Sequence, residues 1–597
     1  MIHADNDSED LRIPRGLWHG LALFVLPVLL VLSGCDSDGG SLNQSPDADF
    51  SITTTDLSAE LSASSSNDPD GEIASYSWEL GDGTEAEGES VSHTYEQGDT
   101  YEVTLTVEDN GGKTDDITKP VTVEVGEVTR PTYANYDTTS AGTVIFNEQS
   151  DNKDGVVPTN PNNNENVRSN YVKWTNDRTY HIDGRTFVNS GDTLEIEPGT
   201  VVKGIPNQDP SNASVLVVAK GATILADGNP GSDDPSQADP IIFTTREDDV
   251  TDPNDLSRDL DGAWGGVIIL GNGPKNFPGA RNVEGIPSDV ERARFGSDNP
   301  DPQYDAGTFR FASIRYGGIS IGAGNEINGL TMGALGSGTT IEYVEVFNNQ
   351  DDSFEWFGGN VNANHLVSAR NGDDAFDIDQ GYSGNLQFLF AVQTPTRGDR
   401  TGEHDGGDDG YGGPDEGDTP FSDPQIYNAT YIGSGPDGEG DIGLKLRDNF
   451  AGNYFNSIFY DFPAQFIEVE DLDSGPDSRA RWEDGDLTVE SSITWKFASV
   501  QDANSPYEAL VENGGNWGSA VADSLEAYGV TYEDPGLSRT LSGSGFQTVG
   551  VIPQNNVSGG QTPPSGFEQV TYKGAFDPSG SNWAKGWTFS DEVGMFQ

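Results

Sequence analysis

Two consecutive stretches of the chain carry nearly the same acidic side chains. Residues 349–355 read NQDDSFE and residues 371–377 read NGDDAFD, so the second set follows the first at an offset of 22 residues. Carboxylate oxygens are the ligands that Ca²⁺ prefers, and carboxyl pairs also act as acid and base in sugar hydrolysis. The acids that we expect to hold a cation are Asp351, Asp352, Glu355, Asp373, Asp374, Asp377 and Asp379.

This offset of 22 residues is typical of one coil of a right-handed parallel β-helix, in which each turn stacks on the one before. Equivalent positions on adjacent coils then lie about 4.8 Å apart, so each acid would lie on its counterpart. Along a strand, Asp377 and Asp379 share one face, while Phe376 and Ile378 point into the core. Carboxylates stacked this closely raise one another's pKa and oppose folding unless a cation lies between them.

The residue types favour Ca²⁺ over other metals. Ca²⁺ accepts about six to eight oxygen ligands in irregular geometry, whereas zinc and copper sites need histidine or cysteine. The chain has only 6 His and 1 Cys, so we expect Ca²⁺ as the cofactor. The alternative is that Asn349 and Asn371 form a structural ladder and the acids are solvated at a turn.

The strands that must position these acids are short and apolar. From Tyr171 onward they recur with Gly, Asn and Asp between them, for example at residues 193–196, 215–218 and 267–270. The connections are mostly longer than hairpin turns, which favours a parallel β-helix over an antiparallel barrel. Residues 394–422 are rich in Gly and Asp, and we expect a long loop there.

The charge of the chain excludes several classes of partner. It has 99 Asp and Glu against 31 Lys and Arg, for a net charge of −68. So acidic a surface repels nucleic acid and anionic lipid, so we expect no nucleic-acid partner. The acid excess also resembles that of proteins from salt-adapted organisms, in which high ionic strength screens the repulsion.

The N-terminal region has the pattern of a secretion signal. Arg12 and Arg15 precede an apolar run at residues 21–32, which is too short to span a bilayer, and Cys35 follows in LSGC. This motif resembles a bacterial lipobox, which implies a signal peptide at residues 1–34, lipid on Cys35 and a flexible tether at residues 35–46. The lipobox implies a protein of the cell envelope that is held only by its lipid anchor. The residues after the cysteine, DSD at 36–38, resemble the acidic export signals of surface lipoproteins, which implies the outer face of the outer membrane.

The next segment, residues 47–126, resembles a PKD domain. The carriers of the resemblance are YSW at 76–78, GDG at 81–83, HTY at 93–95 and YEVTLTV at 101–107. It implies a small β-sandwich in which Trp78 and Tyr95 fill the core. Such a domain is a spacer or a contact module, not an enzyme.

The remainder resembles a family of bacterial lipoproteins with a β-helix similar to that of pectin lyases. The resemblance is carried by EPGTVVKG at 197–204 and by YKGAF at 572–576 with Trp583 and GWT at 586–588. It implies an all-β protein in which residues 127–170 lead from the PKD domain into a β-helix at residues 171–597 with a C-terminal cap. The resemblance implies no defined activity.

A catalytic alternative rests on a likeness to polygalacturonase-type glycosidases. These enzymes carry Asn-x-Asp, Asp-Asp, Gly-His-Gly and Arg-x-Lys in order, and this chain has NQD at 349–351, DD at 373–374, EHDG at 403–406 and KLR at 445–447. Two carboxyls could act as acid and base, and the basic pair could hold a uronate. The residues of this alternative are Asp351, Asp373, Asp374, His404, Lys445 and Arg447.

Three functions therefore follow from the sequence. The first is a surface lipoprotein whose β-helix binds extracellular polysaccharide or a surface protein with Ca²⁺. The second is a glycoside hydrolase or polysaccharide lyase that uses the same acids. The third is a structural component of a surface layer.

Overall fold

The computed structural model divides the chain into two compact units, residues 1–131 and 132–597. The residues that it describes are 43–55, 58–95, 99–123, 137–138, 143–147, 167–168, 171–206, 213–322, 325–407, 419–472, 476–500, 506–512, 517–541 and 547–597. Cys35 and the signal sequence predicted before it lie outside these residues.

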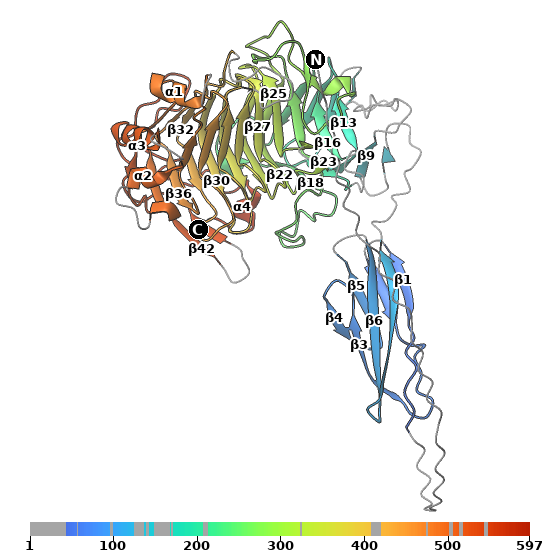
Figure 1. The fold of residues 1–597 in the computed structure, drawn as a ribbon. Helices are drawn as coiled ribbons and strands as arrows, with labels where there is room; N and C mark the ends of the chain where they lie inside the picture. The colour runs from blue at the N-terminus through green and yellow to red at the C-terminus, as the bar shows by residue number, and fades with distance from the viewer. Residues whose placement is uncertain are drawn as a thin grey trace, which may run out of the picture. The chain divides into compact units, whose positions relative to one another are not determined.

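The first unit is a β-sandwich of two antiparallel sheets (Figure 1). One sheet contains β1 (Ser51–Thr55), β2 (Ser58–Ser62) and β5 (Ser90–Thr94). The other contains β3 (Ile73–Glu79), β4 (Glu85–Glu87), β6 (Asp99–Asp109) and β7 (Thr114–Val123). Trp78 and Tyr95 are buried between them, as predicted, and the Tyr95 hydroxyl donates to the carbonyl of Leu80 at 2.9 Å.

The second unit is a solenoid of parallel strands, which confirms the predicted β-helix (Figure 1). Its first long sheet has ten strands, one on each coil. They are β13 (Arg185–Val188), β16 (Val215–Val218), β19 (Val267–Leu270), β25 (Leu330–Leu335), β27 (Phe354–Gly359), β29 (Phe376–Asp379), β31 (Gly402–Asp405), β34 (Leu444–Arg447), β37 (Ile467–Val469) and β40 (Val511–Glu512).

The second long sheet has twenty strands and covers the rest of each coil. Its strands are β8 (Asp137–Thr138), β9 (Thr143–Asn147), β10 (Val167–Arg168), β11 (Tyr171–Trp174), β12 (Thr179–Asp183), β14 (Thr193–Ile196), β15 (Val201–Gly204), β17 (Thr223–Asp227), β18 (Ile241–Thr245), β22 (Gly307–Arg315), β26 (Thr340–Phe347), β28 (Ala363–Ala369), β30 (Asn385–Val392), β32 (Gln425–Tyr427), β33 (Thr430–Ile432), β35 (Asn453–Phe455), β36 (Ile458–Phe462), β38 (Thr488–Glu490), β39 (Ile493–Phe497) and β41 (Thr531–Tyr532).

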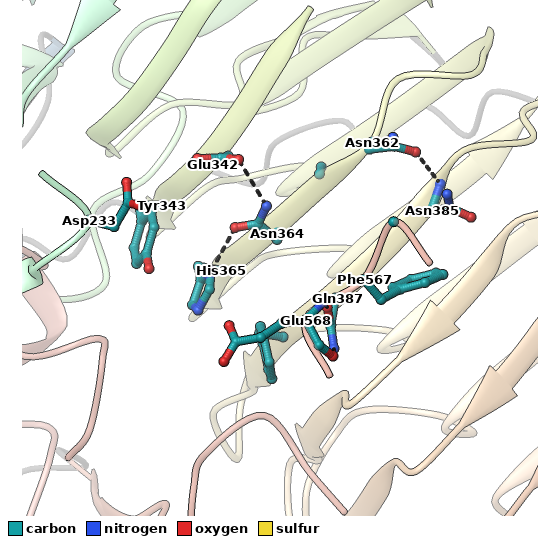
Figure 2. Close-up of a pocket in the computed structure, with 13 residues that line it drawn as sticks. Asp233, Glu342, Tyr343, Asn362, Asn364, His365, Asn385, Gln387, Phe567 and Glu568 are labelled. Atoms are coloured by element: carbon teal, nitrogen blue, oxygen red, sulfur yellow. Dashed lines mark hydrogen bonds between the residues drawn. The ribbon is translucent and has the colours of Figure 1, made fainter. Parts of the chain in front are cut away.

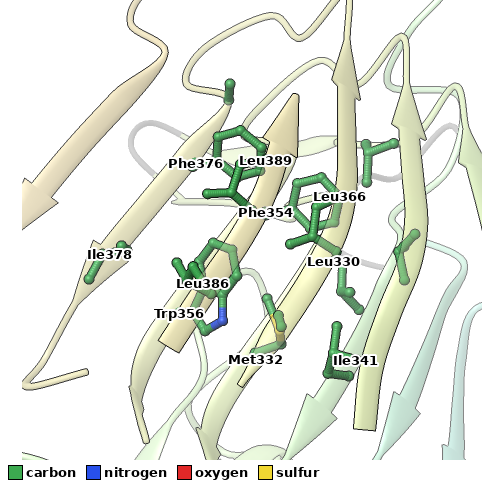
Figure 3. Packing of buried hydrophobic residues seen from close by; sticks show 14 of the residues in the cluster. Leu330, Met332, Ile341, Phe354, Trp356, Leu366, Phe376, Ile378, Leu386 and Leu389 are labelled. Carbon is green, nitrogen blue, oxygen red and sulfur yellow. The ribbon is translucent and has the colours of Figure 1, made fainter. Parts of the chain in front are cut away.

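The core of the solenoid consists of columns of apolar side chains, one from each coil (Figure 3). Phe354 stacks on Phe376 with 5.4 Å between ring centroids, and Trp356 lies in register with Ile378. Every second residue of β27 and β29 contributes to these columns. The residues between them are therefore directed outward, which is where the acids lie.

Four short α-helices accompany the solenoid within the described residues: α1 (Ser478–Asp484), α2 (Pro506–Leu510), α3 (Trp517–Ala527) and α4 (Phe589–Glu592). Leu510, Val521 and Leu525 belong to the core cluster, so α2 and α3 cover its C-terminal end. The last segment, with the hairpin β42 (Ser538–Leu541) and β43 (Gln547–Gly550), packs on the second long sheet through a separate apolar cluster. There Glu345 is buried and accepts hydrogen bonds from the first amides of α4.

Two smaller hairpins lie in the excursions between coils. They are formed by β20 (Arg281–Asn282) with β21 (Arg294–Phe295) and by β23 (Ser320–Gly322) with β24 (Asn325–Glu326). Residues 394–422 are not a continuous loop as expected, because β31 lies within them and continues the ten-stranded sheet.

Candidate functional site

The repeated acids line one groove on the outer face of the ten-stranded sheet. Its volume is about 220 Å³. Its walls are Glu284, Glu326, Asn328, Asp351, Asp352, Glu355, Phe357, Asp373, Asp374, Asp377, Asp379, Glu403, Asp405 and Arg447. Thus all seven acids predicted as cation ligands lie together in this groove.

The strand register explains this convergence. Glu355 of β27 lies directly beside Asp377 of β29, and Asp377 lies directly beside Glu403 of β31. Neighbouring strands of a sheet are about 4.8 Å apart, so three carboxylates form one column across three coils. A second column places Asp405 of β31 beside Arg447 of β34.

The turns that precede β27 and β29 supply the Asp pairs. The amide of Asp374 donates to the Asp352 carboxylate at 2.8 Å, and the amide of Arg400 donates to Asp374 at 2.6 Å, so each carboxylate is tied to the following coil. Asn349 and Asn371 are fully buried, and their side chains donate to backbone carbonyls of their own turns. Each asparagine thus stabilises its own turn, and the acids beside it are not all solvated: Asp352 and Asp374 are only 8% and 3% exposed.

Burial and mutual repulsion raise the pKa of most carboxyl groups in the groove. The loss of hydration is the largest cause at Asp352, Asp374 and Asp377, and the neighbouring carboxylates add to it. The same causes raise the pKa of Asp351 to about 8 and that of Asp373 to about 6. Near neutral pH the cation-free groove therefore retains protons.

Basic side chains neutralise only one end of the groove. Arg447 binds Asp405 through two hydrogen bonds of 2.6 and 2.9 Å and also lies 3.3 Å from Glu403. Arg400 lies 2.9 Å from Glu403, and Lys445 lies 3.6 Å from it. Burial acts to raise the pKa of Glu403, but a hydrogen bond with Asp374 and the charges of these three basic side chains together lower it. Lys445 and Arg447 thus face Glu403 and Asp405, one coil beyond the predicted Asp373 and Asp374.

Three sets of carboxylate oxygens in the described residues are close enough to share a metal ion, with all ligand atoms of a set within 4.8 Å of one another. The sets are Asp351, Asp352 and Asp373; Asp352, Glu355 and Asp377; and Asp373, Asp374 and Asp399. One oxygen of Asp377 is buried and accepts no hydrogen bond within the described part of the chain. Such an oxygen needs a proton or a cation, so the donor set fits Ca²⁺.

His404 does not belong to the site, contrary to its role in the catalytic alternative. It alternates with Glu403 and Asp405 along β31, so its ring points inward and is fully buried. Its Nε2 lies 2.6 Å from the Tyr454 hydroxyl, and burial lowers the pKa of the ring to about 4. His404 is therefore a core residue and has no access to a ligand in the groove.

The candidate residues predicted from the sequence did not include five of the polar groove residues. Glu403 and Asp405 repeat the alternation of Asp377 and Asp379, and this signal could have identified β31 as a further coil. Glu284, Glu326 and Asn328 come from the excursion between β19 and β25, and no repeat marks them. Asn328 donates a hydrogen bond to Glu355.

Comparisons with known proteins give two family matches. The profile of the family described as pectate-lyase-like β-helix domain matches residues 166–524, and that of the PKD domain matches residues 43–125. A search of curated proteins gives no match.

Three solved structures resemble parts of the chain. The PKD1 domain of Vibrio anguillarum Epp is 38% identical, with 14% of this chain and 100% of that chain covered and a TM-score of 0.14. The PKD1 domain of the Vibrio cholerae metalloprotease PrtV is 32% identical, with 14% and 99% covered and a TM-score of 0.13. A structure described as a carbohydrate-binding module of the β-sandwich superfamily is 31% identical, with 18% and 41% covered and a TM-score of 0.14.

Proposed function

This chain belongs to the pectate-lyase-like β-helix family and carries a PKD domain ahead of the β-helix, and from that premise we propose that its acidic groove binds Ca²⁺ and, through Ca²⁺, an extracellular polysaccharide. The observation that carries the proposal is the meeting of three carboxylate sets in one groove, with Asp352 common to two of them.

The electrostatics of the groove support a divalent cation. The buried Asp352 and Asp374 carboxyl groups have raised pKa values because of lost hydration and of neighbouring carboxylates, and a bound cation counteracts both causes by replacing hydration and neutralising charge. The unpartnered oxygen of Asp377 becomes a ligand of the cation in the same step. Ca²⁺ binding should therefore release protons and strengthen as the pH rises.

The expected class of polysaccharide follows from the charge. Without a cation the groove repels any acidic sugar, and Lys445 and Arg447 are already paired with Glu403 and Asp405. A Ca²⁺ ion held by three carboxylates has open coordination positions. Uronate carboxylates can take those positions, so the partner that we propose is an acidic polysaccharide bound only when Ca²⁺ is present.

Calorimetric titration of the protein with Ca²⁺ tests the first half of the proposal. We expect binding that is weakened at least tenfold by Asp352→Asn and unchanged by Asp523→Asn, a matched substitution of an exposed acid on α3. Polygalacturonate and alginate are then tested as partners with Ca²⁺ and with a chelator. The proposal fails if Ca²⁺ does not bind, or if the polysaccharides bind equally well in the chelator.

A second function, cleavage of the polysaccharide, is favoured by one specific contact. The carboxyl groups of Asp374 and Glu403 share a hydrogen bond, which raises the pKa of Asp374 beyond the effect of its burial and lowers that of Glu403. A protonated and an ionised carboxyl side by side are the pair that general acid–base chemistry requires. Release of reducing ends that is lost in Glu403→Gln, with Ca²⁺ binding retained, would distinguish a hydrolase from a binding protein.

We also propose that Cys35 anchors the protein to the outer membrane as a surface lipoprotein, on the basis of the LSGC motif after the apolar run. In the part of the chain that the structure describes, no helix is long and apolar enough to cross a membrane. When the protein is expressed in a Gram-negative host supplied with labelled palmitate, it should incorporate the label. The label should be absent from Cys35→Ser, and accessibility to added protease on whole cells tests the surface location.

A further inference from the structure

A second cleft lies on the twenty-stranded sheet and has a volume of about 230 Å³ (Figure 2). Its floor is formed by β26, β28 and β30, and one wall is formed by residues 566–568 of the C-terminal segment. No predicted site residue lies in it. It is lined by Asp233, Glu342, Tyr343, Asn362, Ala363, Asn364, His365, Asn385, Gln387, Phe388, Gly566, Phe567 and Glu568.

A column of aromatic rings forms the rigid side of the cleft. Tyr343 stacks on His365 with 4.2 Å between ring centroids, and His365 packs on Phe388 at 4.7 Å. These three residues have positive φ values of 51°, 55° and 57°, which bends each strand at the same point and turns the rings outward in register. The stacked faces are covered by their neighbours, and Trp583 packs at right angles to both Tyr343 and His365, with ring centroids 6.4 and 4.9 Å away. The polar ring atoms are therefore what these rings offer to a ligand.

Two linked hydrogen bonds determine which ring nitrogen of His365 carries the proton. The Asn364 amide nitrogen donates to Glu342 at 3.1 Å, so the Asn364 oxygen is left to accept from His365 Nδ1 at 2.6 Å (Figure 2). Burial lowers the pKa of His365 to about 3, so the ring is neutral. With its proton on Nδ1, His365 has an unprotonated Nε2, which is a hydrogen-bond acceptor.

Tyr343 supplies a donor next to this acceptor. Its side chain is 8% exposed, and its hydroxyl has no hydrogen-bond partner among the described residues. The carboxylates of Asp233, Glu342 and Glu568 are near enough to raise the pKa of this hydroxyl further, after burial as the main cause. Tyr343 therefore remains a neutral donor, surrounded mainly by acceptors.

The C-terminal wall is held in place by one side chain. Gln387 is 4% exposed and binds the backbone of Glu568 twice, by accepting from its amide at 2.7 Å and donating to its carbonyl at 3.0 Å. These bonds join positions 181 residues apart in the sequence. The cleft is thus a built feature of the folded chain, and Gln387 is its positioning residue.

We propose that this cleft binds one neutral sugar unit of a polysaccharide, independently of Ca²⁺. Its acceptors match the hydroxyl donors of a sugar, and the Tyr343 hydroxyl can donate to a ring or hydroxyl oxygen. No Arg or Lys lines the cleft itself. Arg310, outside its lining, pairs with Asp233 at 2.7 Å and with Glu342 at 3.6 Å, which leaves the exposed Glu568 carboxylate to repel uronates and sulfated sugars. The metal-capable sets of the described residues do not include His365, which argues against a metal ion here.

Saturation-transfer NMR on the full chain tests this site, with glucose, galactose, mannose, N-acetylglucosamine and their short oligomers as probes in the presence of a chelator. We expect one or more probes to bind. Tyr343→Phe should weaken that binding about three- to tenfold because one hydrogen bond is lost, and Glu568→Gln about tenfold. The matched controls are Glu526→Gln, on helix α3, and Tyr528→Phe, just after it. Both should leave the binding unchanged.

The outcomes separate this site from the acidic groove. Binding that persists in Asp352→Asn and in the chelator supports a distinct site, whatever the Ca²⁺ titration shows. The proposal is overturned if no neutral sugar binds, or if binding is equal in Tyr343→Phe and the wild type. It is also overturned if the cleft takes only amines such as spermidine, which would make it a cation site.

Discussion

The acidic groove and the second cleft are both built from columns of side chains on neighbouring strands, but the side chains that meet in those columns differ in charge. In the groove, Glu355, Asp377 and Glu403 follow one another across three coils, so carboxylate meets carboxylate. In the cleft, Glu342 lies between Arg310 and Asn364, each within 3.6 Å of its carboxylate. The strand spacing is the same in both places, so the residue on the next coil decides whether a column needs a cation.

The comparison also concerns protons. Away from the end that Arg400, Lys445 and Arg447 neutralise, repulsion between the groove carboxylates is relieved by protonation or by a metal ion. In the cleft, Glu342 is instead satisfied by an arginine and an amide. A solenoid can therefore carry a metal-dependent and a metal-independent surface on different faces, because each face is a set of columns fixed by the coil register.

The largest expected difference between the two regions is the pH dependence of stability without metal. The groove carboxyls have raised pKa values in the folded protein, about 6 for Asp373, 7 for Asp405 and 8 for Asp351, mainly because of burial. Their contribution to stability is present below the unfolded pKa near 4 and is lost as the pH rises through these values. In a chelator we expect the melting temperature to fall by several degrees between about pH 5 and pH 8, and added Ca²⁺ to reverse most of the fall.

Calorimetric melts of the wild type over this pH range, with and without Ca²⁺, measure the effect. A melting temperature that rises with pH in the chelator would show that the groove carboxyls are ionised and satisfied without a metal.

The next largest effect concerns one groove substitution, whose effect on stability should change sign when Ca²⁺ is added. Asp352→Asn removes a buried acid from the centre of two cation sets, so it should stabilise the protein in a chelator, by roughly 1 kcal/mol, and destabilise it relative to the wild type in Ca²⁺. Denaturant unfolding in both conditions measures the two differences. An equal loss of stability in both would mean that its hydrogen bond with the Asp374 amide matters more than its charge.

A smaller effect is expected from a substitution that places two carboxylates side by side in the cleft, as they already are in the groove. Asn364→Asp would place a carboxylate directly beside Glu342 and remove the donor that satisfies it. We expect a loss of about 1 kcal/mol near neutral pH that is recovered on acidification, because like charges on neighbouring strands repel. Asn364→Ala is the control, since it removes the hydrogen bond without adding charge and should show no such pH dependence.

The smallest expected effect is that of an exposed acid outside both regions. Asp523→Asn on α3 should change the free energy of unfolding by less than about 0.5 kcal/mol at any pH and leave Ca²⁺ binding intact. A larger effect would indicate that the total charge of −68 influences stability more than the contacts between stacked side chains in the groove and the cleft. Thermal melts of this variant at low and high salt provide the measurement.

Part of the fold could be predicted from local patterns. The alternation in FDID at 376–379 and the similar FEWF 22 residues earlier indicate which side chains face outward and which coil they follow. The PKD domain was recognisable because its aromatic and glycine positions are fixed by a small sandwich core. Residues 402–405 were harder, because 26 residues separate Asp377 from its neighbour Glu403 and the even spacing is lost.

The sequence by itself determined that carboxylates would stack, because a repeat of one coil length places identical positions one strand apart. Only the tertiary structure decided how deep those acids lie, that Glu284 and Glu326 close the groove from a distant excursion, and that His404 points inward. It also formed the second cleft, by returning residues 566–568 across strands that precede them by nearly two hundred positions. Such contacts depend on where whole segments pack, and no local periodicity encodes that.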